Sequence, residues 1–96
     1  MKYFDWNPDK NEWLRKERGI TFEEIIFYLL HEGLLDVIAH PNQKKYPGQR
    51  IFIIAVEDYA YIVPFVETDS CIFLKTIIPN NKMTKKYLRG DSHETE

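Results

Sequence analysis

The chain has 96 residues, of which 44% are hydrophobic and 29% charged, with a formal net charge of −2. This length suits one domain with one hydrophobic core, and the composition excludes an intrinsically disordered or collagen-like chain. No apolar run approaches the ~20 residues that span a bilayer and the N-terminus lacks a signal-peptide core, so we expect a cytoplasmic protein without membrane partners.

The N-terminal third predicts a short strand followed by two helices. After a strand at residues 2–6, Asn7-Pro8 predicts an N-cap with proline at the first helical position, and the helix should end at Gly19. Thr21-Phe-Glu-Glu24 is a capping-box pattern that begins a second helix, which we expect to stop near Gly33. Its apolar residues recur at helical spacing and predict one face that lies across a sheet: Phe22, Ile25, Ile26, Leu29 and Leu30.

The middle of the chain changes to the period of β-strands. Strands are predicted at residues 35–40, 50–56, 59–66 and 71–78. Pro64 cannot donate to a ladder, so it indicates an edge position or a bulge. We therefore predict an α+β fold, in which the short N-terminal strand and two helices pack on an antiparallel sheet of four to five strands.

The segment after the last strand, residues 79–89, is predicted to form a short C-terminal helix. Four cations there are spaced at i, i+3, i+4 and i+7 and would share one helix face: Lys82, Lys85, Lys86 and Arg89. Cations anchored beside a buried strand suit a polyanion, whereas the alternative is an ordinary solvated face of a terminal helix. The domain is expected to cover residues 1–90, with a disordered tail at 91–96.

Charge is distributed in segments along the chain. Bases gather at residues 10–18, 44–50 and 75–89, while acids gather around 23–24, 57–58 and 67–69 and in the tail. Such a surface can offer a basic groove to RNA or the same groove to an acidic protein partner. No set of ligands has the spacing of a metal site and there is no glycine-rich phosphate loop, so we predict neither a metal nor a cofactor. The single cysteine, Cys71, suits a reducing compartment.

Two segments near the ends of the chain resemble the BrnT family of bacterial toxins. Trp6-Asn7-Pro8-Asp9-Lys10 and Arg18-Gly19-Ile20-Thr21-Phe22-Glu23-Glu24 are similar to its Trp-Asp-Pro-x-Lys and Lys-His-Gly-Val-Ser-Phe-Glu-Glu motifs, at the same spacing. Ile77-Ile78-Pro79-Asn80-Asn81-Lys82-Met83-Thr84 is similar to its Ile-Ile-Ser-Ala-Arg-Lys-Ala-Thr motif. The resemblance extends from about residue 4 to residue 87, with little to align between the motifs.

This resemblance implies a RelE-like fold of the RelE/ParE-like superfamily. It also implies the toxin of a type II toxin–antitoxin system, which cleaves RNA until a cognate antitoxin from the same operon covers it. The chain departs from the motifs at Glu17, Arg18 and Asn81, and Asn81 replaces an arginine that could grip a phosphate. A divergent branch that uses Lys82 or Lys85, a chain that has lost activity and a deliberate inactivating substitution all remain open.

Metal-independent cleavage of RNA needs a base for the 2′-hydroxyl, an acid for the leaving oxygen and cations for the phosphate. His40 is the histidine placed nearest to a possible groove, although a histidine is more often a surface or structural residue. The candidate catalytic residues are Asn81, Lys82, Lys86 and His40. The candidate RNA-binding residues are Arg50, Lys75, Lys85 and Tyr87, the last by hydrogen bonding or base stacking.

Two functions from different classes remain. The first is an endoribonuclease toxin whose basic groove binds RNA and is neutralised by an antitoxin, as a homodimer or within a toxin–antitoxin heterotetramer. The second is a catalytically inactive RelE-fold interaction module, whose groove receives a segment of a protein partner. Asn81 favours the second, and the lysines beside Tyr87 favour the first, because a protein-binding groove would hold more apolar surface.

Overall fold

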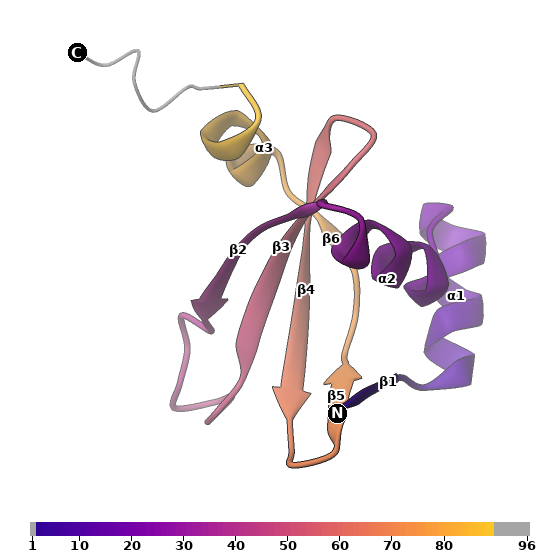
Figure 1. Ribbon diagram of the computed structural model, residues 1–96, viewed down its shortest axis with the longest axis vertical. Helices are drawn as coiled ribbons and strands as arrows, with labels where there is room; N and C mark the ends of the chain where they lie inside the picture. The colour runs from indigo at the N-terminus through magenta and orange to yellow at the C-terminus, as the bar shows by residue number, and fades with distance from the viewer. Residues whose placement is uncertain (1, 90–96) are drawn as a thin grey trace.

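The computed structural model describes residues 2–89 and has the predicted α+β class, with three helices and one sheet (Figure 1). The predicted tail at 91–96 lies outside the described residues. The elements in chain order are β1 (Tyr3–Asp5), α1 (Pro8–Arg18), α2 (Phe22–Leu30), β2 (Leu34–Ala39), β3 (Arg50–Val56), β4 (Tyr59–Glu67), β5 (Cys71–Leu74), β6 (Ile78–Pro79) and α3 (Asn81–Tyr87). No helix within residues 2–89 has the length and apolar content needed to cross a bilayer.

The sheet is mixed, which corrects the expectation of an antiparallel one. It has six strands where four to five were predicted, in the order β1-β5-β4-β3-β2 with β6 also paired to β4. The pairs β2–β3, β3–β4 and β4–β5 are antiparallel as predicted. The short N-terminal strand β1 instead pairs parallel with β5, with Tyr3 opposite Cys71 and Asp5 opposite Phe73. Parallel pairing needs a long connection between the strands, and nearly the whole domain lies between β1 and β5.

The predicted strand at 71–78 is divided into β5 and β6, and Pro64 accounts for the break. Pro64 lies inside β4, which pairs along one side with β3. On the other side its carbonyl accepts a hydrogen bond from the Lys75 amide at 2.8 Å, but proline has no N–H to donate in return. The pairing of β4 with β5 therefore ends at Leu74, and β4 pairs again with β6 from Ile78. The predicted edge position for Pro64 is wrong, because β4 lies inside the sheet, and the interruption is in the pairing on the β5–β6 side.

Both N-terminal helices begin as predicted. The Asn7 side chain accepts hydrogen bonds from the amides of Asp9 and Lys10, and α1 ends at Gly19, whose φ is 68°. Thr21 and Glu24 form the complete capping box at the start of α2. These caps satisfy amides that have no partner inside the helix.

Helix α2 ends at Leu30, three residues before the predicted stop, and Gly33 has a different role from the one expected. The left-handed residue is Glu32, with φ of 71°, rather than the glycine. The Gly33 amide donates to the Tyr28 carbonyl at 2.7 Å, and a Cβ at position 33 would lie 2.5 Å from that same oxygen. Glycine is needed here because two backbone segments approach closely.

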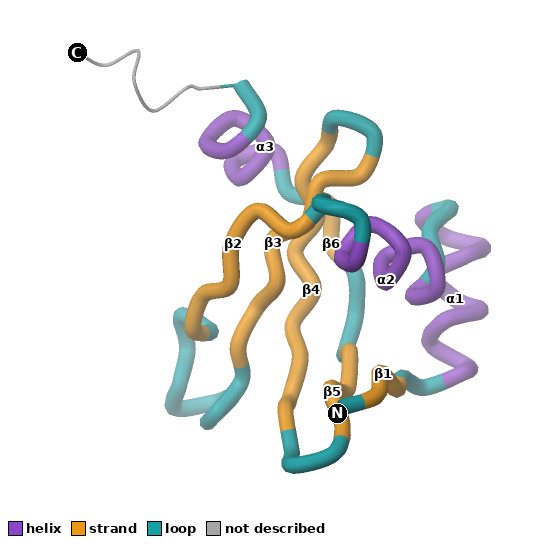
Figure 2. Tube along the Cα trace, viewed as in Figure 1, coloured by secondary structure: helices purple, strands orange, loops and turns teal. Residues whose placement is uncertain are grey.

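The sheet separates two apolar clusters and makes the fold three-layered. Helices α1 and α2 cover one face, while α3 lies on the other side (Figure 2). The larger cluster lies under α1 and α2 and consists of Leu14, Ile20, Phe22, Ile25, Phe52, Ile54, Val63, Phe65, Leu74 and Ile77. The smaller cluster has Ile51, Ile53 and Ala60 as its buried members, with Met83, Tyr87 and Leu88 packed against it. Helix α3 therefore has one apolar side that packs against the sheet and one side that faces away from it.

Candidate nucleic-acid interface

Helix α3 is fixed to the first residues of β4 by hydrogen bonds. The Asn80 side chain caps the helix by accepting from the Met83 amide at 2.8 Å, and the Asn80 amide donates to the Ala60 carbonyl at 3.0 Å. Thr84 is 1% exposed; its Oγ1 accepts from the Ala60 amide at 2.8 Å and donates to the Asn80 carbonyl at 2.9 Å. Sequence reasoning missed Thr84, although a hydroxyl on the inward side of a helix beside a strand could have indicated it.

A second attachment joins the end of α3 to β2. The Tyr87 hydroxyl donates to Oδ2 of Asp36 at 2.6 Å, and Oδ1 of Asp36 accepts from the Val37 amide at 2.8 Å. The hydrogen bond from Tyr87, followed by the Val37 amide, holds the pKa of Asp36 below its ordinary value, and the Lys86 charge adds to this. The same bond raises the pKa of Tyr87. Tyr87, a candidate RNA-binding residue, therefore also anchors the helix.

The outward side of α3 carries Asn81 and three lysines, all exposed: Lys82, Lys85 and Lys86. We refer to these three lysines as the α3 lysine patch. None of the ion pairs within residues 2–89 includes any of the three, and α3 contains no acidic residue. Because the inward side of α3 is held by Thr84 and Tyr87, the patch is a set of exposed cations on a fixed support, and Lys86 lies close enough to Asp36 to lower the pKa of that carboxyl group.

The fourth predicted member of this face, Arg89, lies beyond the helix. Leu88 is the C-cap of α3, and the Arg89 guanidinium pairs with Oδ2 of Asp58 at 3.0 Å. Asp58 lies in the tight turn between β3 and β4, where it and Glu57 have φ values of 71° and 51°. The charge of Arg89 is thus compensated at the β3–β4 turn.

Other candidate residues lie apart from the α3 lysine patch. Lys75 is in the connection between β5 and β6, with Nζ 5.6 Å from the centroid of the Phe73 ring. His40 follows β2 at the opposite end of the sheet. Its ring lies tilted against that of Tyr46, with 4.4 Å between the ring centroids, and its Nδ1 accepts from the backbone amide of Asn42 at 3.0 Å. The structure does not bring His40 together with the lysines.

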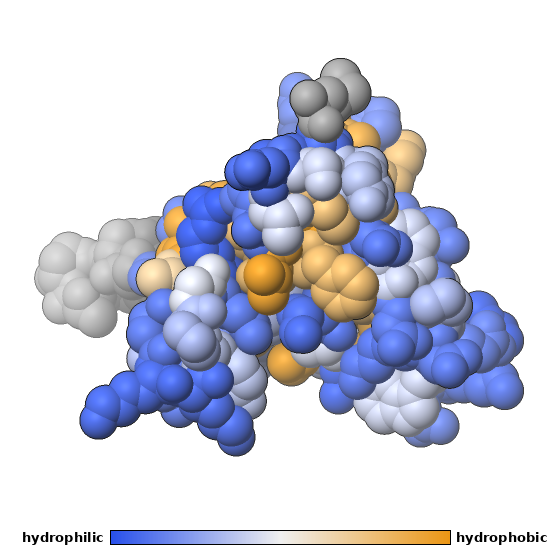
Figure 3. All heavy atoms as spheres, turned by 90° about the horizontal axis from the view of Figure 1, so that it is seen from below, coloured by the Kyte–Doolittle hydropathy of each residue, from blue (hydrophilic) through white to orange (hydrophobic). Residues whose placement is uncertain are grey.

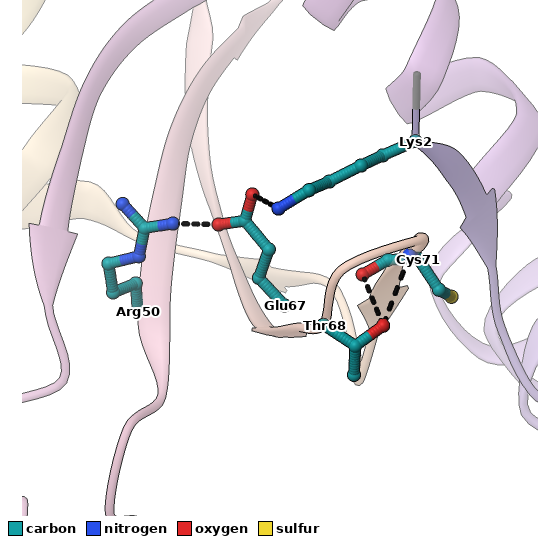
Figure 4. A network of polar contacts seen from close by, with 5 residues as sticks. All are labelled: Lys2, Arg50, Glu67, Thr68 and Cys71. Carbon is teal, nitrogen blue, oxygen red and sulfur yellow. Dashed lines mark hydrogen bonds and ion pairs between the residues drawn. The ribbon is translucent and has the colours of Figure 1, made fainter.

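Arg50 is also distant from α3 and is engaged in an ion-pair network (Figure 4). In the sheet, the backbone of Arg50 lies opposite Phe65, near the end of β4, whereas α3 is attached at the start of β4. The Glu67 carboxylate accepts from both Lys2 and Arg50, and the hydrogen bond from Lys2 is the main cause of its lowered pKa. This carboxylate compensates the Arg50 charge, so Arg50 is less available to a phosphate than the lysines of α3.

Within residues 2–89 there is no enclosed pocket and no group of three or more side chains suited to hold a metal ion. The exposed side chains of this part of the chain form open surfaces. The α3 lysine patch is such a surface, and single-stranded nucleic acids bind along open cationic surfaces of this kind.

Comparisons of the chain with protein-family models, curated proteins and solved structures found no match. The BrnT resemblance therefore rests on the sequence motifs alone. In the structure the first two motifs lie around the starts of α1 and α2, where Trp6 stacks on Phe22 at 5.8 Å, and the third forms β6 and the start of α3.

Proposed function

We propose that this protein is the toxin of a type II toxin–antitoxin pair and that it engages RNA through the α3 lysine patch. The observation that carries the proposal is the patch itself, three exposed lysines that form no ion pair within residues 2–89, on a helix held by a buried threonine. The backbone of α3 is already ordered, so only the lysine side chains lose freedom when phosphates bind, which favours binding. We also propose that the chain is a member of the BrnT family and has a RelE-like fold.

The proposed activity is metal-independent cleavage of RNA. Lys82 and Lys86 would stabilise the charge that develops on the scissile phosphate, with Lys85 as a backbone contact. Asn81 stands beside them in the first turn of α3, at the place where the resembling motif has arginine. An amide can donate a hydrogen bond but adds no charge, so this position decides how strong phosphate stabilisation is.

A second candidate function is a catalytically inactive interaction module that binds a protein partner. Two observations favour it: Asn81 carries no charge, and His40 lies at the other end of the sheet from the lysines. In this alternative, the α3 lysine patch binds an acidic segment of the partner rather than RNA.

RNA binding by the patch is tested with the double variant Lys82→Ala/Lys86→Ala. Both side chains are exposed, so the variant should keep the circular dichroism spectrum of the parent while its affinity for a fluorescent single-stranded RNA falls. In the log–log salt plot the slope should become shallower by about 0.7 for each phosphate that the variant no longer neutralises.

The matched control is Arg15→Ala/Lys16→Ala, which removes two exposed cations from α1, beyond the other face of the sheet. It should bind RNA like the parent. Equal weakening of RNA binding in the two double variants would mean that binding follows net charge rather than the α3 lysine patch, and the proposed interface would be wrong.

Cleavage is tested by induced expression of this chain beside Asn81→Arg, with growth and total RNA followed at early times. Growth arrest with RNA degradation in both cultures would show an active toxin that works through its lysines. If only the arginine variant acts, position 81 is catalytic and the chain is a disarmed ribonuclease. If neither acts, the interaction module becomes the better account.

A further inference from the structure

Four large apolar side chains are exposed on the same side of the sheet as α1 and α2: Phe27, Leu30, Leu34 and Val37. Their exposed fractions are 54%, 65%, 40% and 37%. Phe27 and Leu30 are three residues apart, so they lie on one side of α2. Leu34 and Val37 pair with Ile54 and Phe52, two members of the cluster beneath α1 and α2. We refer to these four residues as the apolar patch.

Scattered apolar residues on a surface need no explanation, but neighbouring ones indicate a contact. The apolar patch lies where α2 leads into β2, and these two elements contact each other. The opposite end of the molecule, seen from below in Figure 3, is mostly hydrophilic with a few hydrophobic side chains in its middle. The apolar patch includes residues of β2, which is an edge of the sheet. An edge strand is a site where another chain can associate, and exposed apolar side chains on it favour this association.

The backbone of β2 is partly blocked against addition of another strand. The His40 amide donates inward to the Gln49 carbonyl at 3.0 Å, so by the alternation of an antiparallel ladder the Val37 amide points outward. Oδ1 of Asp36 already accepts from this Val37 amide at 2.8 Å. A partner on the apolar patch must therefore use side-chain contacts more than an extended hydrogen-bond ladder.

The charges at the two ends of β2 have opposite signs. The exposed Glu32 lies two residues before the first residue of β2. The exposed Lys44 and Lys45 lie in the loop that follows the other end of the strand. Two copies related by a two-fold axis across β2 would place the acidic end of each copy on the basic end of the other.

We propose that a second copy of this chain covers the apolar patch, in a two-fold homodimer with antiparallel β2 strands. A standard interface buries about 800 Å² per partner. Even a fully buried aromatic side chain contributes only about 150–250 Å² of this area. The four side chains of the apolar patch are already partly covered, so the interface between the two copies must also include the charged segments beside the patch. The charge pattern selects another copy over an unrelated apolar segment. This inference is independent of the proposed action on RNA.

The first test measures mass by sedimentation equilibrium from about 1 to 100 µM, a range that covers micromolar affinities. The parent should be a dimer. Leu30→Arg, at the most exposed position of the apolar patch, should raise the dissociation constant by at least about a hundredfold, because an unpaired charge is then buried. The control is Tyr3→Ser, which removes an aromatic residue that is 59% exposed on β1, the opposite edge of the sheet. A monomeric parent, or equal weakening by both variants, overturns the proposal.

The second test reverses the charges and examines the antiparallel arrangement. Glu32→Lys alone and Lys44→Glu/Lys45→Glu alone should each weaken the dimer about tenfold or more, by placing like charges together. The variant with all three substitutions should recover the parent affinity to within about threefold, since it restores opposite charges across the axis. Failure of this recovery would overturn the antiparallel dimer.

Discussion

At the scale of single residues, the buried hydroxyl of Thr84 joins α3 to the sheet through one accepted and one donated hydrogen bond. Thr84→Val keeps the shape of the side chain but leaves the Ala60 amide without its acceptor. We expect the free energy of unfolding in urea to fall by about 1–3 kcal/mol. Thr84→Ser keeps the hydroxyl and should lose only about 0.8 kcal/mol, for the missing methyl group. Similar losses for valine and serine would mean that packing, not hydrogen bonding, holds Thr84.

Gly33 has an equally specific requirement. An alanine Cβ would meet the Tyr28 carbonyl oxygen at 2.5 Å, and that atom belongs to the backbone of α2. Gly33→Ala should therefore lower the free energy of unfolding by about 1–3 kcal/mol through steric overlap. The control is Gly48→Asn, where φ is 76° and no atom lies within 4 Å of the added Cβ, so asparagine fits. If thermal unfolding of Gly33→Ala equals that of the parent, the close approach is not required.

At the scale of elements, α3 offers two adjacent asparagines with different roles. Asn80 caps the helix through the Met83 amide, whereas Asn81 is the exposed first residue of the helix. Asn80→Ala should cost about 0.5–2 kcal/mol of stability. It should also weaken RNA binding, because the α3 lysine patch would lose its fixed support. Asn81→Ala should leave stability within about 0.5 kcal/mol of the parent. Equal unfolding midpoints for the two variants would argue against the cap.

Local signals in the sequence were sufficient for most elements. Asn7-Pro8, Gly19 and the Thr21–Glu24 capping box fixed the ends of α1 and the start of α2, because caps act within one helical turn. The alternating strands β2 to β4 were also predictable. The division of the last strand was not, since it depends on Pro64 of a neighbouring strand facing Lys75.

At the scale of the whole molecule, contacts between distant segments decided what the sequence could not. β1 pairs with β5 at the edge of the sheet opposite β2, and nothing within residues 3–5 specifies that edge. The candidate site was affected in the same way. Helical spacing placed Lys82, Lys85 and Lys86 together, but only the sheet register shows that His40 and Arg50 are at the other end. Spacing along the chain carries no information about such separations.

The balance of charges across the molecule predicts a loss of stability in acid. The pKa values of Asp36, Glu67 and Glu12 are all lowered, chiefly by hydrogen bonds from Tyr87, Lys2 and Arg15 respectively. A carboxyl group whose pKa is lower in the folded state than in the unfolded state stabilises the fold. This stabilisation is complete at pH values above the pKa of the unfolded state, which is about 4. That stability is lost as the pH falls through the folded pKa. The urea midpoint should therefore be nearly constant above about pH 6 and should decrease steadily below about pH 4.

Glu67→Gln separates this effect from general acid denaturation. The variant cannot change charge at position 67, so its urea midpoint at neutral pH should be lower than that of the parent, because Lys2 and Arg50 lose their shared carboxylate. The difference between the two proteins should then shrink as the pH falls, since the parent carboxylate becomes protonated and resembles glutamine. A difference that stays constant down to about pH 2.5 would show that the ion pairs at Glu67 do not contribute to stability, because this range extends well below the ordinary carboxyl pKa.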